Sequence, residues 1–156
     1  DMRRKDREVT DFKKMMQILE SCDCCRIGLV DQGEAYIVPL NFGYEEVNGQ
    51  ITLYFHGAAQ GRKAELLKKT ETLAFEMDTK HTLVEGETAC DFSYLYQSIM
   101  GKGKVKIFAE SADKIEALKK IMAHYSDKQD WTFRPEFVDM TMVFQVQVTE
   151  WSCKEH

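Results

Sequence analysis

The sequence predicts a mainly β fold with three flanking helices, in which about six antiparallel strands form a closed or half-closed barrel. Short runs rich in β-branched and aromatic residues follow one another, with turn residues between them. The pair Asn48-Gly49 separates two of these runs. It is the strongest short signal for a β-hairpin, because a type I′ turn needs positive φ at both central residues. Closing the sheet is the natural way to hide the edges of strands that are consecutive in the chain.

Length and composition are those of one globular domain spanning residues 1–156. Apolar residues make up 44% of the chain and charged residues 30%, which excludes a disordered protein. The net charge of −5, from 21 Lys and Arg against 26 Asp and Glu, argues against a nucleic-acid binder. No apolar run is long enough to cross a membrane. The charged opening MRRKDREVTD is not a secretory signal, so we expect a cytoplasmic protein with reduced cysteines.

The first half of the chain is predicted to alternate helix and strand. Phe12, Met15 and Leu19 recur at helical spacing, which indicates an amphipathic helix over 11–21 with Thr10 as its N-cap. The strands that follow are expected at 26–31, 36–44, 51–56 and 72–77, with a helix between the last two that begins near residue 61.

The second half is predicted to hold one long strand, one helix and a final strand. We expect a loop over 78–92 and a strand over 94–108, in which Gly101 and Gly103 mark a bulge or a close backbone approach. Ser111 is expected to cap the next helix. An irregular stretch over 126–138 and a last strand over 140–149 complete the expected elements.

The start of the helix near residue 61 carries Gly61, Arg62 and Lys63. Backbone N–H groups at a helix start, together with a planar guanidinium and an ammonium group, have the chemistry of a phosphate site. The alternative is an ordinary solvated helix start with two surface cations.

The five cysteines offer a second candidate chemistry. Cys22 and Cys25 have C-x-x-C spacing, and His81 with Cys90 would supply two more ligands for a zinc ion. Packing of buried thiols is the favoured alternative to a metal site or a redox disulfide, and we expect no metal.

Several ordered motifs resemble the FMN-binding split-barrel family that includes pyridoxamine 5′-phosphate oxidase. They are VPLNFGY at 38–44, YFH at 54–56 followed by GRK at 61–63, and YQS at 96–98 followed by GKG at 101–103. The likeness is greater to the small branch of nitroimidazole-resistance reductases, whose opening resembles MRRKDREVTD. The resemblance covers nearly the whole chain and implies an FMN-binding split barrel.

The resemblance also implies the cofactor contacts. Those along the flavin ring fall on six consecutive residues, Tyr36, Ile37, Val38, Pro39, Leu40 and Asn41. The contacts at the end of the next strand fall on His56 and Gly57, the phosphate cations on Arg62 and Lys63, and a polar contact on Ser98. His56 is the candidate catalytic acid, with a structural or phosphate-contacting role as the alternative. The terminal segment WSCKEH lacks the arginine-rich end of the oxidase, so vitamin B6 oxidation is not expected.

Two classes of function follow from this resemblance. The first is an FMN-dependent oxidoreductase that passes electrons from reduced flavin to a small acceptor such as a nitro compound, a quinone or another flavin, with reduced nicotinamide as a candidate donor. The second is a non-catalytic FMN-binding or FMN-storing protein, or a haem-binding relative. The resemblance further implies a homodimer with a flavin at the interface, touched by both chains.

Overall fold

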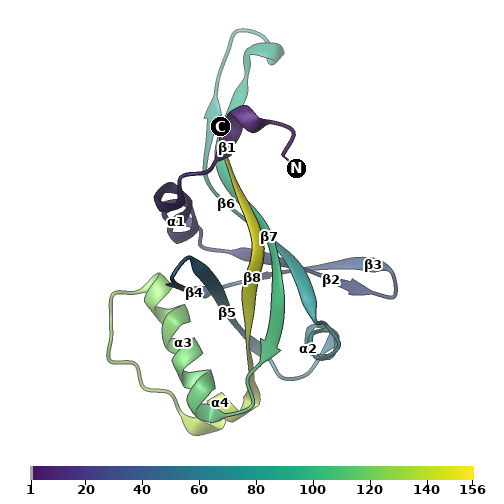
Figure 1. The fold of residues 1–156 in the computed structure, drawn as a ribbon, viewed down its shortest axis with the longest axis vertical. Helices are drawn as coiled ribbons and strands as arrows, with labels where there is room; N and C mark the ends of the chain where they lie inside the picture. The colour runs from purple at the N-terminus through teal and green to yellow at the C-terminus, as the bar shows by residue number, and fades with distance from the viewer. Residues whose placement is uncertain (1) are drawn as a thin grey trace.

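Eight strands form one antiparallel sheet in residues 2–156, the part of the chain that the computed structural model describes (Figure 1). The strands are β1 (Glu8–Val9), β2 (Cys25–Asp31), β3 (Glu34–Leu40), β4 (Gly43–Val47), β5 (Gln50–Ala58), β6 (Thr72–Val84), β7 (Ser93–Ile107) and β8 (Thr141–Glu155). Their order across the sheet is β3-β2-β6-β7-β8-β5-β4, and β1 pairs with β8. The expected class, mainly β with flanking helices, is confirmed, and the sheet is open, with β3 and β4 at its two ends.

Four α-helices and two short 3₁₀ helices accompany this sheet in the described residues. They are α1 (Phe12–Ser21), α2 (Arg62–Lys68), α3 (Ser111–Tyr125), α4 (Pro135–Met140), η1 (Lys5–Arg7) and η2 (Ala89–Asp91). Helix α3 packs across β4, β5 and β8, while α2 lies against β2 (Figure 1). None of these helices is long and apolar enough to cross a lipid bilayer.

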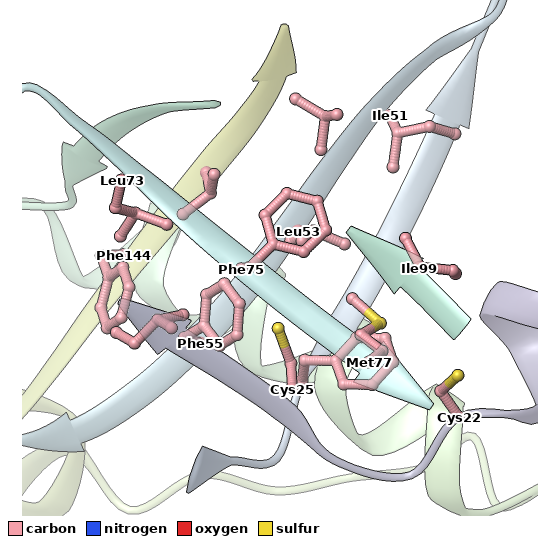
Figure 2. Packing of buried hydrophobic residues seen from close by; sticks show 14 of the residues in the cluster. Cys22, Cys25, Ile51, Leu53, Phe55, Leu73, Phe75, Met77, Ile99 and Phe144 are labelled. Carbon is pink, nitrogen blue, oxygen red and sulfur yellow. The ribbon is translucent and has the colours of Figure 1, made fainter. Parts of the chain in front are cut away.

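The core is one cluster of buried side chains from the strands, α1 and α2. Phe55 from β5 and Phe144 from β8 stack with ring centroids 5.1 Å apart, and Phe75 from β6 lies close by (Figure 2). Ile18 and Leu19 of α1 are also fully buried there, as the helical spacing predicts. Burial of such side chains stabilises the fold by roughly 1.5–3 kcal/mol each.

The hairpin predicted at Asn48-Gly49 is confirmed. Val47 pairs with Gln50 across a two-residue turn, and φ is 52° at Asn48 and 84° at Gly49. Both angles have the sign that a type I′ turn requires.

The strand expected over 36–44 is instead two strands. The chain leaves β3 after Leu40, and β4 begins only at Gly43 on the opposite end of the sheet. Phe42, between them, is fully buried, and its N–H donates to the hydroxyl of Tyr125 in α3. This inward anchor breaks the extended run, so the prediction of one continuous strand was wrong.

The prediction of a loop over 78–92 was wrong for residues 78–84, which are strand, and for Ala89–Asp91, which form a short 3₁₀ helix. Strand β6 continues to Val84 and pairs with β7 from Ser93 onward, with a register shift near Lys80, whose φ is 59°. This outer part of the hairpin projects beyond the rest of the sheet (Figure 1). Because both of its faces are exposed, it lacks the apolar alternation that marks a half-buried strand.

Smaller differences concern the ends of elements. The N-caps are Asp11 and Glu110, one residue away from the expected Thr10 and Ser111, and neither side chain caps its helix. Helix α4 occupies part of the stretch expected to be irregular, and β8 extends six residues past 149. The bulge predicted at the glycines of β7 is confirmed, since the register with β8 shifts between Lys102 and Gly103.

Candidate functional site

The end of β5 and the first turn of α2 bring His56, Gly57 and Lys63 together. The Lys63 amine lies directly over Gly57, in the space that a Cβ atom would occupy. Partial burial lowers the pKa of Lys63. Desolvation, and after it the charge of Lys63, lowers the pKa of His56. His56 therefore favours its neutral form although its side chain still reaches solvent.

Arg62 is held by two residues from neighbouring strands. Its Nε donates to Oδ2 of Asp31 at 2.9 Å, at the end of β2. Its guanidinium carbon lies 4.1 Å from the centre of the Tyr36 ring in β3, a cation–π contact. Both Nη atoms remain without a hydrogen bond to the described residues, so the outer edge of the guanidinium can bind an anion.

Strand β3 divides its predicted ring contacts between two faces. Tyr36, Val38 and Leu40 pack against the core, whereas Ile37 and Pro39 are exposed. Strand β3 is an end strand of the sheet, so one of its edges has no neighbouring strand. A proline, which has no N–H to donate, is tolerated in such a strand. The neighbouring Asn41 is exposed between β3 and β4.

Ser98 lies apart from the other predicted contacts. It is in β7, three strands away from β3 in the sheet order, opposite Asp78 and Lys154. It lines a hollow of about 530 Å³ together with Met100 and Trp151. Within a single chain, Ser98 does not join the group around Arg62 and Lys63.

The two cations have the donors that a phosphate dianion needs. Gly61, with φ of 110°, turns the chain into α2 so that Arg62 and Lys63 follow at once. Arg62 offers its Nη atoms, and Lys63 offers an amine held over Gly57. Helix α2 has only seven residues, so these side chains, more than the helix dipole, would hold the anion.

The model of the pyridoxamine 5′-phosphate oxidase family matches residues 11–155, nearly all of this sequence. The chain belongs to that family. It is 31% identical to a candidate 5-nitroimidazole antibiotic resistance protein from Bacteroides thetaiotaomicron, with a TM-score of 0.82 over 95% of this chain and 86% of the other. The resemblance stated from the sequence motifs is therefore confirmed.

Two less similar structures of the same fold have names that mention other cofactors. A flavocytochrome from Azotobacter vinelandii is 20% identical, with a TM-score of 0.81 over 100% of this chain and 72% of its own. An FAD-binding protein from Mesorhizobium loti is 16% identical, with a TM-score of 0.66 over 96% and 97%. At these identities the likeness supports the split-barrel fold. No protein of curated function matches the sequence.

The cysteines of this family member are free thiols. Cys22 and Cys25 are buried within the core (Figure 2). Burial raises the pKa of Cys22 to about 12 and that of Cys25 well above its ordinary value, so neither is a thiolate at neutral pH. His81 contacts Asp78 instead of either cysteine, and residues 2–156 hold no group of three or more side chains arranged as metal ligands.

Sequence reasoning missed Asp31, the residue that orients Arg62. It ends β2 just before the turn at Gln32-Gly33, and the two side chains are 31 positions apart. It also missed the ion pairs of Arg26 with Glu76 and Asp78 across β2 and β6. No local spacing connects these partners, because only the sheet register brings them together.

Proposed function

We propose that this protein binds FMN and passes electrons from the reduced flavin to a small acceptor such as a nitro compound or a quinone. One observation carries the proposal: in a chain of this family, Arg62 and Lys63 lie side by side in sequence, one fixed by Asp31 and Tyr36 and the other over Gly57. The resemblance of the sequence motifs to the family implies phosphate cations at these two positions.

The phosphate of FMN would be held by Arg62 and Lys63. Asp31 uses only the Nε–H of Arg62, so both Nη groups are left for a bidentate contact. Partial burial of Lys63 strengthens its attraction for an anion, because the surrounding dielectric is lower than that of water. A phosphate monoester is thus favoured over uncharged riboflavin.

The ring would lie along β3, where Ile37 and Pro39 are exposed and Asn41 offers both donors and an acceptor. When bound, FMN supplies the hydride or electron transfer. The protein orients the ring. His56, near the end of β5, has an imidazole nitrogen that can accept a proton and later return it. Reduced nicotinamide is the proposed electron donor.

We further propose that the working form is a homodimer with a flavin at the interface. Val30, Ile37 and Met100 point away from the core on the same face of the sheet and are 71%, 65% and 64% exposed. Covering these side chains with a second copy would bury apolar surface. Ser98 lies on this face too, so a partner could supply it to a site whose cations come from the other chain.

The cofactor is tested first by the absorption spectrum and by two variants. We expect a yellow protein, and we expect Arg62→Ala with Lys63→Ala to weaken FMN by about two orders of magnitude, since hydrogen bonds to charged groups contribute ~1.5–3 kcal/mol each. Riboflavin affinity should hardly change. Lys68→Ala in the same helix, whose amine contacts Glu65, is the matched control. Equal loss of FMN and riboflavin would contradict the phosphate assignment.

The catalytic part is tested by anaerobic reduction. Bleaching by reduced nicotinamide, followed by recovery on adding a nitro compound or a quinone, supports the oxidoreductase. Bleaching by dithionite alone, with no turnover, would instead indicate an FMN-binding or FMN-storing protein. A Soret band in the purified protein would indicate haem.

A further inference from the structure

Strands β2 and β3 form a two-stranded ribbon with a narrow connection to the rest of the sheet. They pair with each other along the whole of β2, from Cys25–Leu40 to Asp31–Glu34. Strand β2 pairs with β6 only through Arg26–Glu76, Ile27–Phe75 and Gly28–Ala74. In Figure 1 the ribbon extends to one side, away from the other strands. These three pairs are the only backbone ladder between the ribbon and the rest of the sheet in the described residues, and α2 contacts the ribbon from the side through Arg62.

A cluster of charged side chains lies at this junction. Nη1 of Arg26 donates to Oε1 of Glu76 at 3.0 Å and to Oδ2 of Asp78 at 3.1 Å. On its other side, Asp78 contacts His81, whose Nε2 lies 2.8 Å from Oδ1. Arg26 thus links β2 to two positions of β6 and extends the junction beyond the three backbone pairs.

The junction is adjacent to the proposed flavin ring. Arg26 lies directly opposite Pro39 in the register of β2 and β3, and both side chains point away from the core. A shift of the ribbon against β6 moves Pro39 and Ile37. Arg62 is tied to the same ribbon through Asp31 and Tyr36, whereas the amine of Lys63 lies over Gly57 of β5, which is not a neighbour of β2 or β3 in the sheet.

We propose that Arg26, held by Glu76 and Asp78, is a positioning residue that fixes β3, together with the Arg62 attached to it, relative to Lys63, and that the protonation of Glu76 sets how firmly it does so. The positioning role rests on the flavin site proposed above.

The charges explain how protonation acts. With Glu76 protonated, the positive Arg26 faces one negative carboxylate, Asp78, and Glu76 can share its proton with that carboxylate. With Glu76 ionised, two carboxylates of the same strand face one guanidinium and repel each other. The ionisable groups around Glu76 are Arg26 from β2, Asp78 with its contact His81 from β6, and the buried thiols of Cys22 and Cys25. In the strand register, β7 presents the uncharged Met100 and Ser98 to Glu76 and Asp78, β3 presents Pro39 to Arg26, and Lys154 of β8 lies beyond Ser98.

The direction of the effect follows from the two carboxylates. Burial, and after it the hydrogen bond and charge of Asp78, raises the pKa of Glu76 to about 7, from an ordinary 4.5. The hydrogen bond from Glu76 lowers that of Asp78. Because the pKa of Glu76 is raised in the folded state, binding of its proton stabilises the fold fully at pH values below the ordinary pKa of 4.5. This stabilisation is lost as the pH rises through about 7. The ribbon should therefore loosen between pH 6 and pH 8.

Hydrogen exchange of the ligand-free protein tests the junction without any flavin. The exchange of β2–β3 amides is measured at pH 6 and pH 8, corrected for intrinsic rates and divided by that of β4–β5 amides in the same sample. We expect this ratio to rise about threefold in the wild type, the modest size that partly exposed ion pairs allow. Glu76→Gln should remove the rise, and Arg26→Ala should raise the ratio at both pH values. Glu150→Gln, which breaks the comparable pair with Lys102 on β7 and β8, is the matched control and should behave as the wild type.

FMN titration of the same variants tests the positioning role. Arg26→Ala should weaken riboflavin as well as FMN, because the strand along the ring moves, and FMN should lose at least as much because Arg62 is held by the same ribbon through Asp31 and Tyr36. A ratio that is independent of pH in the wild type, or a Glu150→Gln variant that matches Glu76→Gln, would overturn the junction. Changed exchange with unchanged flavin affinity would overturn the positioning role. If no variant and no wild-type sample binds FMN while the exchange result holds, the flavin proposal fails and the positioning role with it, whereas the junction stands.

Discussion

At the scale of single residues, Gly57 sets the position of a cation by having no side chain. The Lys63 amine occupies the space of its missing Cβ. We predict that Gly57→Ala displaces this amine and weakens FMN about tenfold or more, since one charged hydrogen bond contributes ~1.5–3 kcal/mol. The fold should tolerate the change, because the displaced atoms are the far end of a flexible side chain. Titration with FMN and riboflavin checks this, and an equal loss of both would mean that the backbone has moved instead.

His56 gives the second prediction at this scale. Its pKa lies below its ordinary 6.5, so the protonated acid is scarce at neutral pH. If His56 returns a proton during reoxidation, the rate should rise as pH falls through that lowered pKa. His56→Gln should remove the rise and leave the flavin spectrum intact. Stopped-flow reoxidation across pH 5–8 measures it, and an unchanged pH profile in His56→Gln would make the residue a binding contact only.

How far these residues could be predicted depends on how local their signal is. Arg62 and Lys63 follow a glycine within three positions, so their chemistry can be stated from the sequence. Asp31 and the partners of Arg26 cannot be found in that way, because they meet only through strand pairing. Whether Ser98 belongs to the same site as Arg62 depends on a second chain, about which spacing along one chain says nothing.

At the scale of elements, the hairpin could be predicted from a local signal, whereas the neighbouring strands depend on tertiary contacts. Asn48-Gly49 specifies its turn by backbone conformation alone, and the structure agrees. The division between β3 and β4 depends on the burial of Phe42 against α3, a tertiary effect. The outer part of β6 was missed because it has no buried face to produce alternation.

The contact between β4 and α3 provides an element-scale prediction. A Cβ atom at Gly43 would overlap the backbone of Lys120 and Ile121, which cannot move as a side chain can. We expect Gly43→Ala to lower the free energy of unfolding by ~1–3 kcal/mol or more. Gly28→Ala is the control, since its Cβ would lie at an ordinary 3.7 Å from the carbonyl of Ala74. Urea denaturation measures both, and equal stability of the two variants would show that α3 does not pack as closely as described.

At the scale of the whole molecule, the proposed second copy would account for two features of one chain together. Ser98 lies three strands from β3 and on the outer face of the sheet, whereas Arg62 lies over Tyr36, whose side chain packs against the core. The face that carries Ser98 also exposes Val30, Ile37 and Met100. A two-fold axis across this face would cover the apolar side chains and bring the Ser98 of one chain to the cations of the other.

Mixed dimers test this arrangement directly. One chain carries Arg62→Ala with Lys63→Ala, and the other carries Ser98→Trp to block the hollow. If each site takes its cations from one chain and its serine from the other, the mixed dimer contains one site with both changes and one with neither. We therefore expect each parent homodimer to bind little FMN and the purified mixed dimer to bind about one FMN per two chains, measured by absorbance after separation on two affinity tags. A mixed dimer that binds no more than its parents would place the whole site within one chain. So would a monomer that sediments with one FMN bound at micromolar concentration, and the shared site would then have to be abandoned.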